Sequence, residues 1–290
     1  MKTFPIPVTV FRAGPTQPRP NETVEIEPSS MPQAEPLVTP APPGDASDDE
    51  LAAASDVVEQ ILRAMRAAQR STRFGAGSLR LSLADLEPGA RHALNQSLGQ
   101  GEVSALVRGA DGRIDWRIQE TAFAGLWRVQ SDDPSGADLL EAGDLPESVK
   151  LAARAGSAAQ FDCAQLPEGV MNAPALVHEL RARARQIGEG RPAQVINLSL
   201  LPLNAADHAG LATLLGEGPV SILSRGFGDC RIASTRAQGV WRVRYFNSMN
   251  TLLLDTIEVV ALPEAARATA EDYADSIERL EELLGWMRGD

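Results

Sequence analysis

The residues best suited to chemistry lie in one glycine-rich stretch, residues 224–232. Cys230 lies there between Arg225 and Arg231, whose positive charges would favour the thiolate form of its side chain. A thiolate could react with a partner or serve as a ligand of a metal cluster. A free cysteine is also among the most often buried residue types, so Cys230 has a second interpretation as a small core side chain.

The glycines of this stretch predict a tight turn. Gly226 and Gly228 allow backbone conformations that other residues avoid, as turns between strands require. A phosphate-binding loop would show the pattern G-x-x-x-x-G-K-[ST] before a helix, and neither feature occurs here. We therefore expect a β-hairpin that places Cys230 on its second strand.

No other residues form a recognised catalytic or metal-binding pattern. The second cysteine, Cys163, adds too few ligands for a metal site, and two cysteines make no disulfide framework. The histidines show no paired spacing, and neither G-x-S-x-G nor H-E-x-x-H occurs. We expect no catalytic residue, no metal and no cofactor, which favours a binding function.

The charge balance excludes one class of partner. The 290 residues carry a formal net charge of -12, and we find no basic stripe that could displace counterions from DNA or RNA. An acidic surface favours solubility and, as an alternative, contact with a basic peptide. No secretory signal and no apolar run long enough to span a membrane is found, so we expect a cytoplasmic protein without membrane insertion.

An internal repeat sets the expected architecture. Residues 81–109 align with residues 198–226 at a spacing of 117, with 13 identical residues in 29 positions. After a three-residue difference the match resumes at a spacing of 114, where Trp127-Arg128-Val129 falls on Trp241-Arg242-Val243. We interpret the chain as a tandem duplication of a module of about 70 residues.

Each copy reads as a mixed module, so the predicted fold class is α+β with an antiparallel sheet and a helix on one side. In the second copy we expect a strand over 195–200, a helix over 204–215 and short strands over 220–223, 230–235, 240–245 and 252–260. Residues 264–287 predict an amphipathic helix that packs on the second copy or on a partner.

The expected organisation has four parts. Residues 1–48 read as a flexible Pro-rich tail with an apolar peptide at 4–8, and residues 49–150 as a helix followed by the first repeat. Residues 151–192 read as a linker with a helix, and residues 193–290 as the second repeat with the C-terminal helix.

The second copy resembles a known family. Its segments 196–202, 216–220, 223–232, 240–248 and 255–259 together resemble the hydrogenase expression/formation proteins of the HupH/HyaF type. The resemblance implies an accessory protein in the maturation of membrane-bound [NiFe] uptake hydrogenases. It implies binding of the iron–sulfur small-subunit precursor before export, alongside a thioredoxin-like accessory protein. It supplies no catalytic residue.

We therefore predict a non-enzymatic chaperone that contacts its partner through the motif of the second copy, at Arg225, Gly226, Gly228, Asp229, Cys230, Arg231, Trp241 and Asn247. The client's twin-arginine leader suggests that the acidic surface meets it. One rival is a thiol-dependent cluster carrier or redox factor that acts through Cys230. Another is a scaffold that joins two accessory proteins through its two similar halves.

Overall fold

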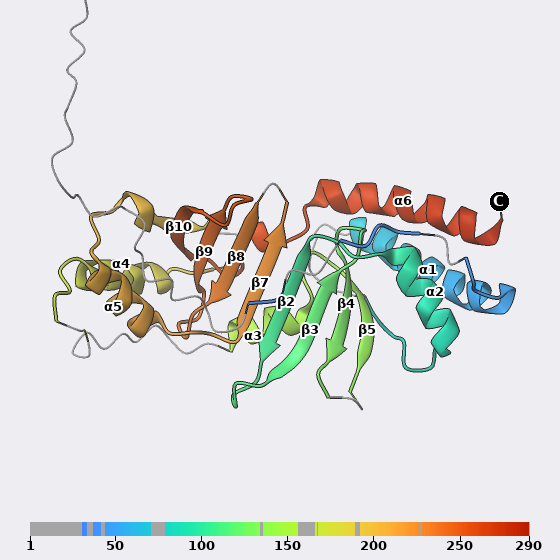
Figure 1. Cartoon of the computed structure of the whole chain (residues 1–290), viewed down its shortest axis with the longest axis horizontal. Coiled ribbons are helices and arrows are strands. Elements are labelled where there is room, and N and C mark those ends of the chain that lie inside the picture. Colours follow the sequence, from blue (N-terminus) through green and yellow to red (C-terminus); the bar gives the residue numbers. More distant parts are fainter. Residues whose placement is uncertain are drawn as a thin grey trace, which may run out of the picture.

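The computed structural model describes residues 31–33, 37–41, 44–70, 79–133, 136–155, 166, 168–188, 192–226 and 228–289. Its centre is one antiparallel sheet of ten strands, with helices gathered at both ends (Figure 1). The predicted α+β class with an antiparallel sheet is confirmed. The expected apolar peptide at 4–8 lies outside the described residues.

The first half contributes five strands and three helices. In chain order these are α1 (Asp48–Gln69), β1 (Leu79–Ser82), α2 (Pro88–Leu98), β2 (Val103–Arg108), β3 (Ile114–Glu120), β4 (Leu126–Ser131), β5 (Asp138–Ala142) and α3 (Glu147–Arg154).

The second half repeats this order with short 3-10 turns added. Its elements are α4 (Ala173–Ala184), β6 (Gln194–Asn197), η2 (Leu198–Leu200), α5 (Ala205–Leu215), β7 (Val220–Arg225), β8 (Asp229–Ser234), β9 (Val240–Phe246), β10 (Leu252–Val259), η3 (Glu264–Ala266) and α6 (Ala270–Arg288).

The sheet order mirrors itself about one junction. The strands run β1-β5-β4-β3-β2-β7-β8-β9-β10-β6, so β2 and β7 meet at the centre. In that pair Ala105 lies opposite Ile222, its own counterpart at the spacing of 117, while Ser104 and Leu106 lie opposite the counterparts of each other. The duplication stays an interpretation of the sequence.

Local sequence signals account for the helix ends. Ser47 begins α1 with a capping box, in which Glu50 bonds back to the Ser47 backbone, and three acidic residues occupy the first turn. Asn204 caps α5 in the same way through Asp207. Gly216 ends α5 with φ 59°, a conformation that glycine adopts without strain. The predicted helix over 204–215 is confirmed by α5.

One predicted strand is partly wrong. Residues 195–200 were expected to form a strand, but β6 ends at Asn197 and Leu198–Leu200 forms the turn η2. The Asn197 side chain accepts a hydrogen bond from the Ser199 backbone N–H at 3.0 Å, and the Ser199 hydroxyl accepts one from Asp255 at 2.9 Å. These side-chain bonds replace the ladder that the matching residues of β1 make.

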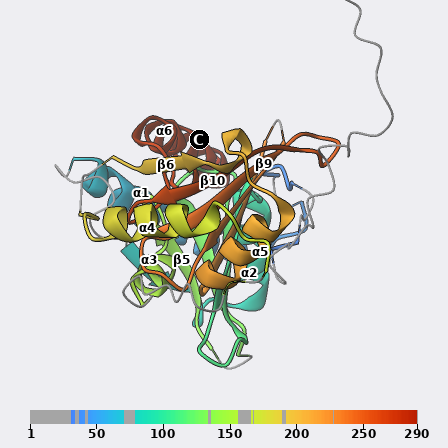
Figure 2. The ribbon, with the colours of Figure 1, turned by 90° about the vertical axis from the view of Figure 1, so that its left-hand side faces the viewer.

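Three apolar cores stabilise the sheet. The first joins α1, α2 and α6 to the β1–β5 end, and the third joins α4 and α5 to the β10–β6 end. The second lies on one face of the central strands, beneath α3 and η3, and draws on both halves. Figure 2 views the molecule from the end that carries α4, and α6 lies above it in that view. Buried Trp127 and Trp241 occupy matching positions in this shared core.

The C-terminal helix packs on the first half, which corrects the expectation that it packs on the second half or on a partner. Its apolar side chains Tyr273, Ile277 and Leu280 join the core that contains α1. Arg288 also forms an ion pair with Glu59 of α1 at 2.6 Å. An amphipathic pattern shows that one face is buried, but it does not say against which surface.

A buried ionic cluster fixes the chain between η3 and α6. Asp144 accepts from Lys150 at 2.6 Å and from Arg267 at 2.7 Å, and both Asp144 and Lys150 are buried. The Asp144 carbonyl also accepts the Ala268 backbone N–H at 2.9 Å. The end of the second half is thereby attached to the first half.

Candidate functional site

The central strands present a second face that no helix core covers. Side chains alternate along a strand, so the neighbours of the shared-core residues point to the opposite side. That side of β2–β4 and β7–β9 carries seven arginines, and we call it the arginine face: Arg108, Arg117, Arg128, Arg225, Arg231, Arg242 and Arg244.

Two hollows lie on the arginine face, one in each half. The larger has a volume of about 640 Å³ over β2–β4 and is bordered by the C-terminal end of α2. The smaller, about 70 Å³, lies over β8 and β9 beside the C-terminal end of α5. The two hollows occupy corresponding positions in the two halves, because α2 and α5 hold the same place in the order of elements.

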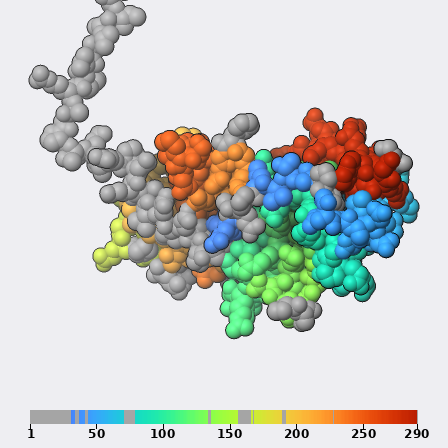
Figure 3. Space-filling view, turned by 45° about the vertical axis from the view of Figure 1, so that its right-hand side comes forward, coloured from blue at the N-terminus to red at the C-terminus, as the bar shows by residue number. Residues whose placement is uncertain are grey.

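A segment from the N-terminal part of the chain crosses this face. We call residues 31–33 and 37–41 the crossing segment; Met31 lines both hollows, and Pro32 is buried. The Val38 carbonyl accepts the Gln100 backbone N–H at 2.8 Å. Figure 3 shows blue N-terminal segments between the green strands of the first half and the orange strands of the second. The arginine face is therefore already contacted by described residues from the N-terminal part of the chain.

This segment corrects part of the expectation for residues 1–48. Besides the Val38 contact, the Ala41 backbone N–H donates to the Gln96 carbonyl at 3.1 Å. Gly99, at φ 60°, lets the chain approach, because a β-carbon there would lie 2.4 Å from the Val38 oxygen. Residues 37–41 are thus part of the folded body, not of a flexible tail.

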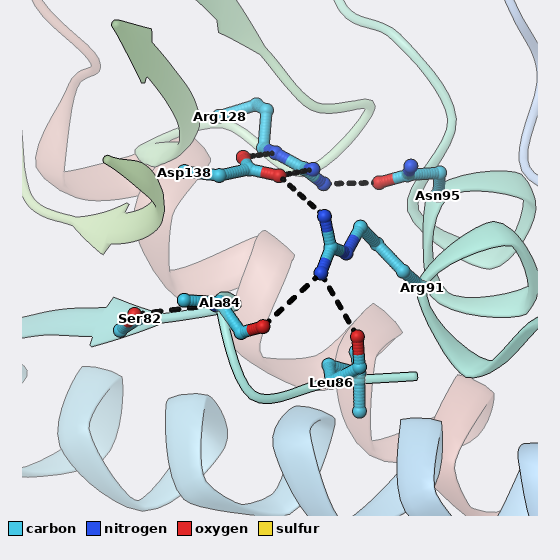
Figure 4. A network of polar contacts seen from close by, with 7 residues as sticks. All are labelled: Ser82, Ala84, Leu86, Arg91, Asn95, Arg128 and Asp138. Carbon is cyan, nitrogen blue, oxygen red and sulfur yellow. Dashed lines mark hydrogen bonds and ion pairs between the residues drawn. The ribbon is translucent and has the colours of Figure 1, made fainter. Parts of the chain in front are cut away.

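The first-half hollow ends in a polar network (Figure 4). Arg128 donates two parallel hydrogen bonds of 2.5 Å to Asp138 and a third to the Asn95 amide oxygen. Arg91 lies 3.6 Å from the same carboxylate and donates to the Leu86 carbonyl at 2.9 Å. The fork of a guanidinium matches a carboxylate in this bidentate geometry, so the network fixes the positions of α2, β4 and β5.

The second-half hollow repeats the central pair. Arg242 donates to Asp255 at 3.1 and 2.7 Å, and these residues are the counterparts of Arg128 and Asp138. Arg231 stacks over the Phe246 ring at 4.1 Å and donates to the Asn250 side chain at 2.6 Å. The mirrored sheet thus places corresponding arginines beside two matched hollows.

Glu120 lies at the edge of the larger hollow and is buried. Its carboxyl accepts the Gly125 backbone N–H at 3.0 Å, in the turn beneath the first turn of α6. Burial raises the pKa of Glu120 to about 7, and the nearby Asp272 and Glu102 carboxylates add to the rise. Near neutral pH this side chain changes between the acid and its anion.

The structure separates seven of the eight predicted contact residues into two groups, and the eighth, Asn247, lies in the β9–β10 turn. Arg225 and Asp229 face each other across the β7–β8 hairpin, with Gly226 and Gly228 in its turn, and Arg231 lies on the same side. The predicted hairpin is confirmed. Cys230 and Trp241 point into the shared core on the opposite side of the sheet.

The geometry of Cys230 opposes an activated thiol. Burial is the main cause that raises its pKa, to about 11, and a hydrogen bond with Tyr245 offsets this only in part. Arg231 adjoins Cys230 in sequence but points to the other face, so its charge does not approach the sulfur closely. Cys163 lies outside the described residues.

Asn247 and Trp241 hold the fold. The Asn247 side chain accepts from the backbone N–H groups of Met249 and Thr251 at 3.0 and 2.8 Å, which shapes the β9–β10 turn. The Trp241 indole donates to the Val260 carbonyl at 3.1 Å, as the Trp127 indole does to the matching Gly143 carbonyl at 2.9 Å.

The sequence analysis did not identify Met31, the larger hollow or the two arginine–aspartate pairs, Arg128–Asp138 and Arg242–Asp255. One signal could have revealed the pairs, because Arg128 and Arg242 match at a spacing of 114 while Asp138 and Asp255 match at 117. Within the described ranges no group of three His, Cys, Asp or Glu side chains could hold a metal ion. No described helix is both long and apolar enough to cross a membrane.

Comparison with known proteins decides the family. The model of the HupH hydrogenase expression protein, C-terminal conserved region, matches residues 51–160 and 170–287. The chain belongs to the HupH hydrogenase expression protein family. Both matched ranges contain one half of the mirrored sheet.

Relatives in this family match along most of the chain. The hydrogenase expression/formation protein HoxQ of Cupriavidus necator is 40% identical over 99% of both chains. HupQ of Azotobacter chroococcum is 42% identical over 92% of this chain and 89% of that protein. A solved structure of the hydrogenase expression protein HupH from Thiobacillus denitrificans is 30% identical, with a TM-score of 0.37, over 38% of this chain and 92% of that one.

Proposed function

We propose that this member of the HupH family is a non-catalytic accessory protein that binds the hydrogenase small-subunit precursor in the cytoplasm before export. The relatives are named hydrogenase expression/formation proteins, which supports the hydrogenase context. The protein would cover surface on a client that lacks part of its iron–sulfur clusters, and would release the client once the clusters are complete.

The arginine face carries this proposal. It extends across strands of both halves and is bordered by the ends of α2 and α5. Residues 31–33 of the chain itself contact it. A face with this shape supports recognition of an extended stretch of another protein. The described residues that line it include no thiol, histidine or paired carboxylates arranged for acid–base chemistry, in keeping with a binding function.

The charge of this face bears on how a client would bind. Six arginines and two glutamates line the two hollows, so they favour acidic or uncharged segments. A basic twin-arginine leader would instead meet the acidic exposed side of α6, which carries Glu271, Asp275, Glu278 and Glu282. A thioredoxin-like accessory protein remains a second proposed partner, supported by the family resemblance.

Recovery of the precursor on the tagged chain tests the proposal. We expect stronger recovery of precursor from cells blocked in cluster insertion than of loaded client, and weaker recovery in 0.5 M salt if the leader meets α6. Arg117→Gln should reduce recovery because Arg117 lines the larger hollow, whereas Arg113→Gln in the nearby turn should not. Equal recovery of loaded and empty client would contradict the holding model.

The Cys230 thiol remains the rival explanation. The serine variant Cys230→Ser separates the two, because a client-binding protein should still support full hydrogenase maturation without the thiol. Loss of maturation by a stably folded serine variant would favour a thiol-dependent cluster carrier or redox factor.

A further inference from the structure

A third hollow lies on the side of the sheet that carries the shared core, away from the arginine face. We call it the core-side hollow. Its volume is about 430 Å³, within the range of roughly 300–1,000 Å³ that is usual for small-molecule pockets. The C-terminal ends of α3, from the first half, and of α4, from the second half, both border it. The hollow therefore lies where the two halves meet.

One wall of the core-side hollow is apolar and firmly packed. Ala153 and Leu262 pack in the shared core, while Ala184 and Ile187 pack against the core of α4 and α5. Gly239, just before β9, has φ 68°, and a β-carbon there would lie 2.4 Å from the Ile187 side chain. Because two cores hold this wall in place, it suits an apolar group of a ligand.

The charged residues of the described lining are all basic. They are Lys150, Arg154, Arg181 and Arg185, although the whole chain has 27 lysines and arginines against 39 aspartates and glutamates. Lys150 is buried and donates to Asp144 at 2.6 Å, and Arg181 is half-buried with contacts of its own, so we assign both to the wall. Arg154 and Arg185 are exposed, and within the described part of the chain neither forms an ion pair.

The helix ends account for only part of this positive charge. The C-terminal end of a helix carries roughly half a negative charge, so the ends of α3 and α4 together offset about one arginine. Even with Lys150 and Arg181 counted as neutralised by their contacts, Arg154 and Arg185 leave about one positive charge at the hollow. On a chain of net charge -12, such a local excess favours an anion.

We propose that the core-side hollow binds a small organic anion, with its phosphate or carboxylate group at Arg154 and Arg185 and its apolar part against Ala184 and Ile187. A guanidinium presents a planar pair of donors that matches either anionic group. Arg154 ends α3 and Arg185 follows α4, so the bound anion connects the two halves. The site lies away from the arginine face and does not rest on the identity of the client.

Ligand-observed NMR titration of the full-length protein with phenyl phosphate and with benzoate tests the site. The two probes share an apolar ring and distinguish a phosphate from a carboxylate. We expect saturable binding of at least one probe, weakened at least about tenfold in the variant R154Q/R185Q because two charge-assisted contacts are lost. Inorganic phosphate and acetate should bind at least about fivefold more weakly than the matching ring compound, because they lack the apolar part.

A matched variant controls for loss of charge alone. R63Q/R113Q removes one exposed arginine from α1 and one from the β2–β3 turn, and it should bind the probe as the wild type does. All four arginines are exposed, so neither variant should shift the thermal unfolding midpoint.

Three results would overturn the proposal. The first is the absence of saturable binding of either probe up to about 10 mM. The second is equal affinity of the wild type and R154Q/R185Q, since the probe would then bind elsewhere. The third is equal affinity for the ring compound and its matching inorganic phosphate or acetate, since the apolar wall would then take no part.

Discussion

Replacing Glu120 by glutamine tests how the buried carboxyl beneath α6 responds to pH. Glutamine keeps an oxygen that can accept the Gly125 backbone N–H, and its side chain has nearly the same size. Glu120 is buried, and this burial is the main reason for its raised pKa. The substitution therefore removes the ionisation with little change in packing.

The direction in which stability changes with pH follows from the number of protons that the folded and unfolded states bind. Because the folded pKa of Glu120 is about 7 and its ordinary value is 4.5, the folded protein binds more protons than the unfolded chain between these values. Stability from this group therefore falls as pH rises from about 4.5 to about 7. The pKa difference, 7 minus 4.5, corresponds to about 3.5 kcal/mol at ~1.4 kcal/mol per pH unit.

Urea unfolding at pH 5 and pH 8 measures the effect. The difference in unfolding free energy between Glu120→Gln and wild type should rise by about 2.5 kcal/mol in favour of the variant from pH 5 to pH 8, because the part of the effect below pH 5 is not sampled. The exposed control Glu282→Gln should show no such rise. A difference that stays constant within about 0.5 kcal/mol across this range would refute the assigned ionisation.

Three further predictions address the shared core and its borders. Trp127→Phe and Trp241→Phe each remove an indole N–H bond to a carbonyl, so each should lower the unfolding free energy by about 1 kcal/mol in urea. In a Cys163→Ala background, Cys230 should react with iodoacetamide at pH 7.5 at least about 100-fold more slowly in the folded protein than in urea, and equal rates would contradict its burial. Asp144→Asn should lower the unfolding free energy by about 3–5 kcal/mol, because Lys150 keeps a buried charge without its anion, and adding Lys150→Met should recover part of this loss.

The sequence predicts features that depend on local signals. The helix α5 shows both its cap, Asn204, and its terminal glycine, Gly216. The strand β9 shows the alternation of Trp241 and Val243 with arginines, and the β7–β8 hairpin shows its glycines. Each is fixed by backbone conformation or by residues one or two positions apart, so the sequence is sufficient.

Features that depend on distant contacts escape the sequence. The sequence shows the apolar side of α6. Its packing on α1 depends on the core of the first half and on the contact of Asp144 with Arg267, just before α6. Cys230 and Arg231 adjoin in sequence, and this adjacency suggests a thiol activated by a neighbouring positive charge. The strand places them on opposite faces, which removes the chemistry that their adjacency suggests.

The mirrored sheet also argues against two independent modules that join separate partners. Five residue pairs connect β2 to β7, and the core beneath α3 and η3 contains Val129 from one half and Val243 from the other. Separating the halves would expose two strand edges and half of a core, and α6 would leave the surface of α1. We therefore expect each half expressed alone to aggregate or stay unfolded, and co-expressed halves to assemble into one particle. Stable, separately folded halves that bind different partners would restore the scaffold hypothesis.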